Sequence, residues 1–276
     1  MSTALVRKLT DADQPQAMAL LAADPVVNCV LTARFVDRGI ERCGGDVWGA
    51  VRSGRLAEVV FVGGSVMPAG GDGAGAAAIG RQLIRMPRRS GSVVGPAREV
   101  EALWRVLADD WGPARDERMD QPLLTFTRAC DVAPDPRVRW AIPNDLAALY
   151  PAALAMFTEE VGVSPLETST EAAYRARLMW LIRQRRVLCR TDRHGVIFKA
   201  EIAAVTPHAC QIQGVWVRPD SRNRGIGTAA MAAVAAAALT VAPIVSLYVN
   251  AYNAPALRSY RRAGFTAMGT MASIHL

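Results

Sequence analysis

One short, basic and glycine-rich loop holds the residues best suited to binding chemistry. Arg222, Arg224, Gly225 and Gly227 fall within a few residues of one another, and from Ile226 onward the chain consists of good helix formers. A helix that begins there points its free N–H groups and the positive end of its dipole back at the loop. Glycines let a ligand approach the backbone, and arginines add charge-assisted hydrogen bonds. The loop therefore predicts a site for a phosphate or pyrophosphate.

The loop differs from the two commoner nucleotide-binding motifs. Walker A requires Gly-Lys-Ser/Thr, and the Rossmann fingerprint Gly-x-Gly-x-x-Gly follows its strand directly. Here Ala230 stands at the third glycine position, and a basic segment separates the glycines from the preceding strand. A surface strand, turn and helix with solvated arginines is the alternative that Gly-x-Gly alone leaves open.

The flanking segments predict the elements that position this loop. Residues 211–217 alternate in side-chain character, which predicts a strand, and Pro219 ends it because proline cannot donate to a sheet ladder. Residues 244–250 predict a buried strand. Asn253 is placed to cap a short helix that stops at Gly264.

Together these segments resemble the GCN5-related N-acetyltransferase (GNAT) superfamily. Arg222-x-x-Gly225-x-Gly227 is similar to the superfamily's Gln/Arg-x-x-Gly-x-Gly/Ala pyrophosphate loop. Residues 250–265 are similar to its late signature, Asn…Ala-x-x-x-Tyr-x-x-x-Gly-Phe. The resemblance implies an enzyme that uses acetyl-CoA as cosubstrate, without a metal, and transfers the acetyl group directly to a primary amine of an unidentified acceptor. A non-catalytic acyl-CoA sensor or interaction protein, or a transferase using a longer acyl-CoA, stays open.

The resemblance also implies which residues bind the coenzyme. Backbone groups of Val215, Trp216 and Val217 would bind pantetheine and the thioester, with the N–H of Val217 donating to the thioester carbonyl. Asn253 would add a polar contact. The pyrophosphate would be held by Arg222, Asn223, Arg224, Gly225, Ile226, Gly227 and Thr228.

Tyr260 matches the family's general acid, which protonates the coenzyme sulfur. The alternative is a tyrosine that packs on the helix face beside Leu257 and Phe265, and Tyr252 is a local rival for the acid.

A carboxylate is expected to act as the base, because an amine acceptor is mostly protonated at neutral pH. Glu159 and Glu160 lie at a helix exit that lines the acceptor groove in the family; a solvated helix end is the alternative. Glu201 lies inside a predicted strand, where a charge is costly unless it is paired or functional. The alternative for Glu201 is an ion pair with Lys199 or an arginine.

The net charge of +7 is unevenly distributed. Residues 1–136 hold 16 basic against 17 acidic residues, and residues 137–276 hold 16 against 8. The positive half contains the loop, which suits an anionic coenzyme. The basic residues are dispersed and no helix-turn-helix, zinc-finger or aromatic RNA-binding signature accompanies them, so we expect no nucleic-acid partner.

The sequence predicts a cytoplasmic protein, monomeric or homodimeric, without a membrane partner. It has no strongly apolar run of the length that a membrane span needs, about 18 residues, and no signal-peptide core at its N-terminus. The scattered cysteines form no Cys-x-x-Cys pair, which favours reduced thiols and no metal site. They are Cys29, Cys43, Cys130, Cys189 and Cys210.

The predicted fold class is α/β (α+β), with two GNAT-like domains, each a mixed, mostly antiparallel central sheet flanked by helices. We expect a degenerate N-terminal domain over residues 1–130, a proline-containing linker over 131–136 and the catalytic domain over 137–276. The glycine-rich segment 69–78 contains no basic residue and is interpreted as a loop. The N-terminal half is interpreted as a scaffold that walls off the acceptor site.

Overall fold

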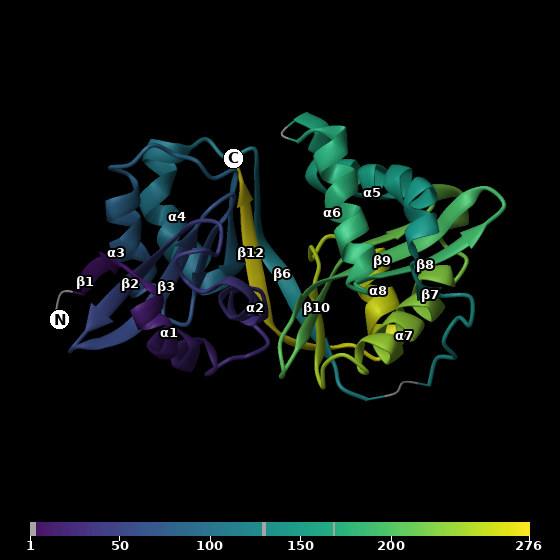
Figure 1. Cartoon of the computed structure of the whole chain (residues 1–276), viewed down its shortest axis with the longest axis horizontal. Coiled ribbons are helices and arrows are strands. Elements are labelled where there is room, and N and C mark those ends of the chain that lie inside the picture. Colours follow the sequence, from purple (N-terminus) through teal and green to yellow (C-terminus); the bar gives the residue numbers. More distant parts are fainter. Residues whose placement is uncertain (1–3, 129–130, 168) are drawn as a thin grey trace. The chain divides into compact units, whose positions relative to one another are not determined.

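The computed structural model describes residues 4–128, 131–167 and 169–276 (Figure 1). The chain divides into two compact units. Unit 1 comprises Met1–Leu123, Tyr248–Tyr252 and Ala267–Leu276, and unit 2 comprises Leu124–Leu247 and Asn253–Thr266. Each unit combines helices with a mostly antiparallel sheet, which confirms the predicted fold class.

The sheet of unit 1 has the strand order β1-β2-β3-β4-β5-β12-β6. Its strands are β1 (Leu5–Lys8), β2 (Asp46–Arg52), β3 (Arg55–Val62), β4 (Val66–Ala69), β5 (Ser92–Pro96), β6 (Asp116–Phe126) and β12 (Thr266–His275). Its helices are α1 (Gln14–Leu21), α2 (Cys29–Arg38), α3 (Ala74–Leu83) and α4 (Ala97–Trp111), with the 3-10 turn η1 (Asp11–Asp13). The pair β4–β5 is parallel, and β4 follows β3 as a short antiparallel strand that the sequence analysis did not predict.

Local sequence explains the β2–β3 hairpin and the helix that covers it. Ser53 and Gly54 have φ angles of 50° and 77°. Two positive φ angles are what a two-residue type I′ turn needs to match the twist of its strands. Helix α3 follows, and its buried Ile79 and Leu83 pack in one core with Leu103 of α4.

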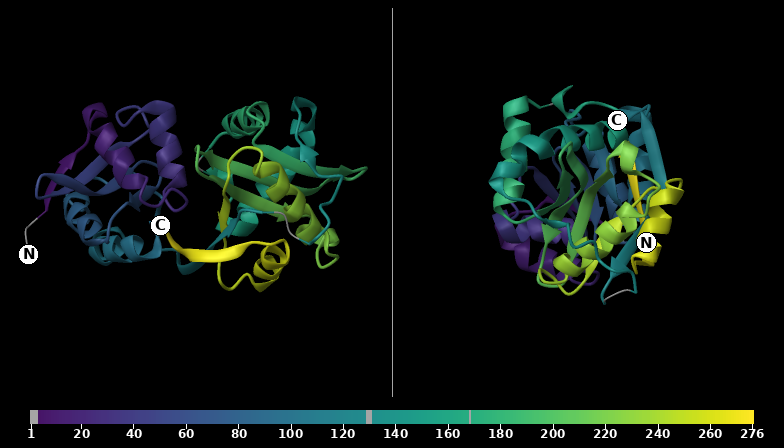
Figure 2. Two further views of the ribbon diagram at one scale, coloured as in Figure 1. Left: turned by 90° about the horizontal axis from the view of Figure 1, so that it is seen from below. Right: turned by 90° about the vertical axis from the view of Figure 1, so that its right-hand side faces the viewer.

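The sheet of unit 2 has the order β11-β10-β9-β8-β7. Its strands are β7 (Arg139–Trp140), β8 (Val187–Asp192), β9 (Gly195–Val205), β10 (Cys210–Val217) and β11 (Val245–Tyr248). Its helices are α5 (Leu146–Val161), α6 (Glu171–Arg183), α7 (Ile226–Ala238) and α8 (Ala254–Arg262), with the 3-10 turns η2 (Pro143–Asp145), η3 (Pro165–Glu167) and η4 (Pro219–Ser221). Figure 2 shows α5 and α6 on one face of this sheet and α7 and α8 on the other.

The last strand of the chain, β12, belongs almost wholly to unit 1. It pairs antiparallel with β5 from Met271 to His275, and its buried Ala272 and Ile274 lie in the core beneath α3 and α4. The units are therefore not continuous stretches of sequence. The linear division into 1–130, 131–136 and 137–276 stays a prediction about the domains.

Strand β6 begins at Asp116 and ends at Phe126. Its first half alternates polar with apolar side chains too weakly for a strand pattern. Asp135, within the expected linker, is only 5% exposed because its carboxylate pairs with Arg190, 2.7 Å away. Its N–H also donates to the carbonyl of Ala229, so this segment is anchored in unit 2.

Among the described residues, the cysteines are buried and form no disulfide, while Cys130 lies outside the described residues. None of the helices in the described ranges is long and apolar enough to cross a membrane. Within the same ranges, no group of three or more His, Cys, Asp or Glu side chains could hold a metal ion.

Candidate functional site

Strand β10 carries a β-bulge just before the basic loop. Gln213 faces Glu201 and Trp216 faces Lys199 across the β9–β10 ladder, so two residues on β10 oppose one on β9. Gly214, within the bulge, has a φ of 57°, in the left-handed region that glycine adopts without strain. The bulge changes the direction of the backbone that continues to Val217.

Strand β10 also separates from its other neighbour. Parallel pairing with β11 is confined to Cys210 opposite Val245 and Gln211 opposite Ser246. In the described chain no residue of β11 faces the second half of β10. That side of the second half of β10 is therefore not covered by β11.

The N–H of Val217 points to this unpaired side. Arg218 donates its N–H to the carbonyl of Ile197 on β9, at 2.8 Å. N–H and C=O groups alternate between the two sides of a strand, so the polar groups of Val217 point away from β9. The carbonyl of Val217 accordingly accepts a bond from Arg222 Nε at 2.9 Å. This orientation suits the donor role expected of Val217.

Helix α7 begins at Ile226, the residue that the sequence predicts. Its N-cap is Gly225, with a φ of 76°, and no side chain caps the helix. Ala229 donates the first intrahelical bond to the Gly225 carbonyl. The N–H groups of Ile226, Gly227 and Thr228 thus have no partner within the helix, as at the start of any α-helix. They form the anion-binding end that the loop motif predicts.

Glu159 lies against this loop and is fully engaged by it. One carboxylate oxygen accepts from Arg222 Nη2 at 2.6 Å, and the other accepts from Trp216 Nε1 at 3.1 Å. The carboxylate therefore links the end of α5 to both β10 and the loop. The side chain of Glu159 nevertheless stays 44% exposed at the helix end.

Glu201 is buried at 1% exposure, and its carboxylate has three partners. Lys199 Nζ lies 2.8 Å from Oε1, while Gln213 Nε2 and Arg177 Nη2 lie 3.2 and 3.4 Å from Oε2. Burial alone would raise the pKa of the Glu201 carboxyl, but the charges of Lys199 and Arg177 outweigh it and hold that pKa below its usual value. The ion pair considered for Glu201 is present.

Lys199 also connects Glu201 to the bulge. Its ammonium group is completely buried and donates to the carbonyl of Gly214 at 3.1 Å. A side chain at Gly214 would crowd Met156 Cε and Lys199 Nζ, at 3.0 and 3.3 Å from the added Cβ. The Lys199–Glu201 pair and Gly214 together stabilise the bulged conformation of β10.

Tyr260 lies on α8 with only 8% of its surface exposed, and its ring contacts Phe265 at a centroid distance of 6.1 Å. Burial raises the pKa of its hydroxyl well above the usual range, and the negative charge of Glu160 adds to this shift. The hydroxyl therefore keeps its proton at neutral pH. Both the acid role and the packing role considered for Tyr260 fit this environment.

The two other candidates on this segment have simpler environments. The side-chain oxygen of Asn253 accepts from the N–H of Ala256 at 3.2 Å, so Asn253 caps α8 as predicted. Its amide nitrogen is left for a further contact. Tyr252 is 72% exposed and its hydroxyl accepts from Asn250.

Several residues of this site escaped the sequence analysis. Gly214 and Arg177 carry no motif, because a bulge and a long-range ion pair leave no periodic signal. Lys199 was noted only as a partner for Glu201. One of only two lysines in the chain, placed inside a strand, was the available signal.

Comparison with known families assigns the C-terminal half. Residues 156–265 match the acetyltransferase (GNAT) family, and residues 45–149 match a domain of unknown function, DUF4081. Residues 156–265 form a GNAT domain. The resemblance seen in the loop and the late signature is thereby confirmed, and every candidate site residue lies inside the GNAT domain. The match over 45–149 fits a degenerate N-terminal domain.

Solved structures share the fold of the whole chain. An acetyltransferase of the GNAT family from Colwellia psychrerythraea is 12% identical, with a TM-score of 0.64 over 99% of both chains. A GCN5-related N-acetyltransferase from Sphaerobacter thermophilus is 18% identical, with a TM-score of 0.66 over 99% of this chain and 94% of that one. A tandem GNAT protein from the clavulanic acid biosynthesis pathway is 13% identical, with a TM-score of 0.58 over 99% and 98%. A comparison with curated proteins found no match.

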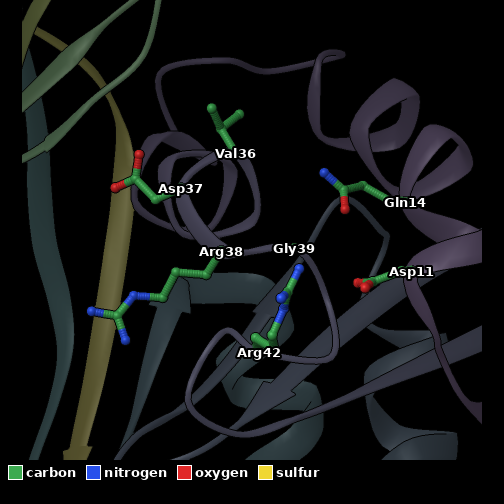
Figure 3. A pocket seen from close by; sticks show the side chains of 7 residues that line it. All are labelled: Asp11, Gln14, Val36, Asp37, Arg38, Gly39 and Arg42. Atoms are coloured by element: carbon green, nitrogen blue, oxygen red, sulfur yellow. The ribbon is translucent and has the colours of Figure 1, made fainter.

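A hollow of about 620 Å³ lies in unit 1, whereas the GNAT domain belongs mainly to unit 2 (Figure 3). Its polar groups are largely engaged. Asp11 accepts from the N–H groups of Ile40 and Glu41, and Gln14 donates to the carbonyl of Phe35. Figure 3 shows the Arg38 side chain directed away from Asp11 and Gln14.

Proposed function

We propose that the chain is an acetyl-CoA-dependent N-acetyltransferase that acts on a primary amine. The observation that carries the proposal is the junction of β10 and α7. There a bulged strand, whose Val217 N–H is directed away from β9, leads into an uncapped helix N-terminus beside Arg222. A strand donor suits a thioester carbonyl, and the helix end suits a diphosphate.

In the proposed complex the residues of the loop bind the coenzyme. The N–H groups of Ile226, Gly227 and Thr228 donate to the diphosphate, and the guanidinium groups of Arg222 and Arg224 balance its charge. Val215 and Trp216 flank the pantetheine, and Asn253 contributes its free amide nitrogen. Asn223, which has a φ of 59°, and Gly225 give the loop its turn.

In the proposed transfer, a bond forms between the amine nitrogen and the acetyl carbonyl carbon, and the carbon–sulfur bond breaks. The N–H of Val217 donates to the carbonyl oxygen as negative charge develops there. Tyr260 donates its proton to the departing sulfur. The amine nitrogen loses one proton to the base, so the sulfur gains as many protons as the amine loses. The raised pKa of Tyr260 keeps it in the form that this step requires.

Among the three candidate carboxylates, we assign the base role to Glu160. Glu159 accepts from Arg222 and Trp216, contacts that hold the loop. The charges of Lys199 and Arg177 keep the pKa of Glu201 below its usual value, which makes Glu201 a weaker base. Glu160 is exposed, and its charge acts on Tyr260. A base near the acid shortens the path by which Tyr260 regains its proton.

A second candidate function is a non-catalytic acyl-CoA sensor. It is favoured because the carboxylates of Glu159 and Glu201 form structural contacts with Arg222, Trp216 and Lys199. A transferase and a sensor both bind the coenzyme, but only a transferase turns it over. The deciding experiment incubates the protein with radiolabelled acetyl-CoA and a panel of amines that spans small amines, amino sugars and peptides.

The proposal expects label in at least one amine, and less of it with the Glu160→Gln variant. Label released only as acetate at the background rate of hydrolysis, while acetyl-CoA still binds, would favour the sensor. The matched control is Glu171→Gln, which removes an exposed acidic residue at the other end of the same connection between α5 and α6. Longer acyl-CoA donors in the same assay test the acyl chain length.

A further inference from the structure

Unit 1 contains a helix start built like the one in the proposed coenzyme site. Helix α3 joins the parallel strands β4 and β5, as α7 joins β10 and β11. Both helices begin after a glycine N-cap with positive φ, 88° at Gly73 and 76° at Gly225. The glycine-rich segment that sequence analysis interpreted as a loop therefore leads into a second helix N-terminus of the same construction.

The free N–H groups of α3 are taken by carboxylates of the chain itself. Ala74 donates to Asp72 Oδ1 at 3.0 Å, and Gly75 donates to Glu58 Oε2 at 2.8 Å. The N–H of Ala76 also lowers the pKa of the Glu58 carboxyl. The next N–H along the helix, that of Ala77, is bonded to the carbonyl of Gly73.

The glycines of this segment make room for Glu58. A Cβ added at Gly71 would overlap Glu58 Cδ, and one added at Gly75 would lie 2.7 Å from Glu58 Cβ. Glu58 is 1% exposed, and its Oε1 has no hydrogen-bond partner among the described residues. No Lys or Arg in the described ranges forms an ion pair with it. A buried carboxyl group without a cationic partner is costly, so this is an unusual way to cap a helix.

A hollow of about 490 Å³ opens beside the same helix end. Asp72, Gly73 and Ala74 line it together with Arg98, Glu101 and Arg105 of α4, and Glu101 pairs with Arg105. Solvent therefore reaches the start of α3, while Glu58 is not among the residues that line the hollow.

We propose that the carboxyl group of Glu58 fills the N-terminus of α3 and excludes a diphosphate from it. Unit 1 therefore binds no coenzyme, and the chain has a single coenzyme site, at α7. The number of coenzyme sites rests on the proposed function, whereas the occupation of the α3 site by Glu58 does not.

The test is chemical rescue of Glu58→Ala by formate. Removing the carboxyl group leaves a space lined by N–H donors, and formate supplies a carboxylate that fits it. We expect 0.2 M sodium formate to raise the Tm of Glu58→Ala by roughly 3 °C relative to sodium chloride of equal ionic strength. Wild-type protein, Glu58→Gln and Leu83→Ala should show no such difference, because the first two keep the site filled and the third opens an apolar space in the same core.

Equal effects of formate on Glu58→Ala and Leu83→Ala, or on Glu58→Ala and Glu58→Gln, would overturn the proposal. If Glu58→Ala does not fold in chloride, recovery of folded protein on refolding from urea in formate against chloride gives the same comparison.

The number of sites is measured separately, by equilibrium dialysis of wild-type protein with CoA. One CoA per chain supports the proposal, and two per chain would overturn it. No binding at all would contradict the proposed function alone, because the formate result does not depend on CoA.

Discussion

The hydroxyl of Tyr260 lies in surroundings that favour its protonated form. Its side chain is enclosed against Phe265, and the charge of Glu160 makes loss of the proton still less favourable. A proton donor to a thiolate must keep its proton until charge develops on sulfur, and these surroundings meet that requirement.

We therefore expect Tyr260→Phe to lower kcat by roughly 10²- to 10⁴-fold, the usual contribution of a general acid. The affinity for acetyl-CoA should stay unchanged, because the ring keeps its packing. The measurement is steady-state acetyl transfer together with calorimetric titration. Tyr252→Phe, an exposed tyrosine on the same segment, is the control and should retain full activity. An unaltered kcat in Tyr260→Phe would remove the acid role.

The environment of Glu58 predicts how the free energy of unfolding depends on pH. Burial raises the pKa of its carboxyl to about 7 from an ordinary value of 4.5, and the nearby carboxylates Glu99 and Asp72 add to the shift. The N–H groups of Gly75 and Ala76 oppose it without cancelling it. The protonated form is thus favoured in the folded state, so the contribution of Glu58 to folding stability is greatest below pH 4.5 and is lost as the pH rises through 7.

The expected loss from Glu58 is about 3 kcal/mol between those limits, from a shift of some 2.5 pKa units. Urea unfolding between pH 4.5 and 8 measures it. Glu58→Gln removes the titration, so the difference between wild type and variant should grow with pH in favour of the variant. A difference that does not change with pH would mean that Glu58 titrates normally.

The β-bulge in β10 depends on the buried pair beneath it. Lys199 on β9 donates one hydrogen bond to Glu201 and another to the Gly214 carbonyl, so its side chain links β9 to the bulge in β10. Removing one member of such a pair leaves the other buried with too few partners, whereas removing both need not be costly.

Lys199→Met should lower the free energy of unfolding by about 3 to 5 kcal/mol. Lys199→Met combined with Glu201→Met should lie closer to wild type, because no uncompensated charge then stays buried. Urea unfolding of the wild type, both single variants and the double variant completes the cycle. If the double variant is less stable than either single variant, the pair does not act as a unit.

At the scale of elements, the sequence predicted what local chemistry controls. The start of α7 at Ile226 and the Asn253 cap of α8 both follow from residue types and were predicted. The bulge and the Lys199–Glu201–Arg177 cluster depend on residues far apart in sequence, so no local pattern could reveal them. Glu58 shows the same limit, because its partners lie in a glycine-rich segment that looked like a simple loop.

At the scale of the whole molecule, the last strand of the chain completes the sheet of unit 1. Ala272 and Ile274 of β12 are fully buried in the core of that unit. Strand partners are chosen by tertiary contacts, so no local sequence pattern assigns residues 266–275 to this sheet.

Deleting residues 267–276 should therefore expose β5 and open the core of unit 1. We expect faster hydrogen exchange at amides of β5, α3 and α4, with little change in β8 and β9 of unit 2. Ala272→Asp should act in the same way, and Gly269→Asp, at an exposed position of the same strand, should not. Unchanged exchange in unit 1 would instead support the linear domains 1–130 and 137–276.

The most direct test of the central claim is calorimetric titration of the protein with acetyl-CoA. The account predicts micromolar binding that is lost with Arg222→Ala and kept with Arg183→Ala, which removes an exposed arginine of α6 and so changes the net charge equally. Absence of binding by the wild-type protein, or equal binding by all three proteins, would contradict the claim that the junction of β10 and α7 is a coenzyme site.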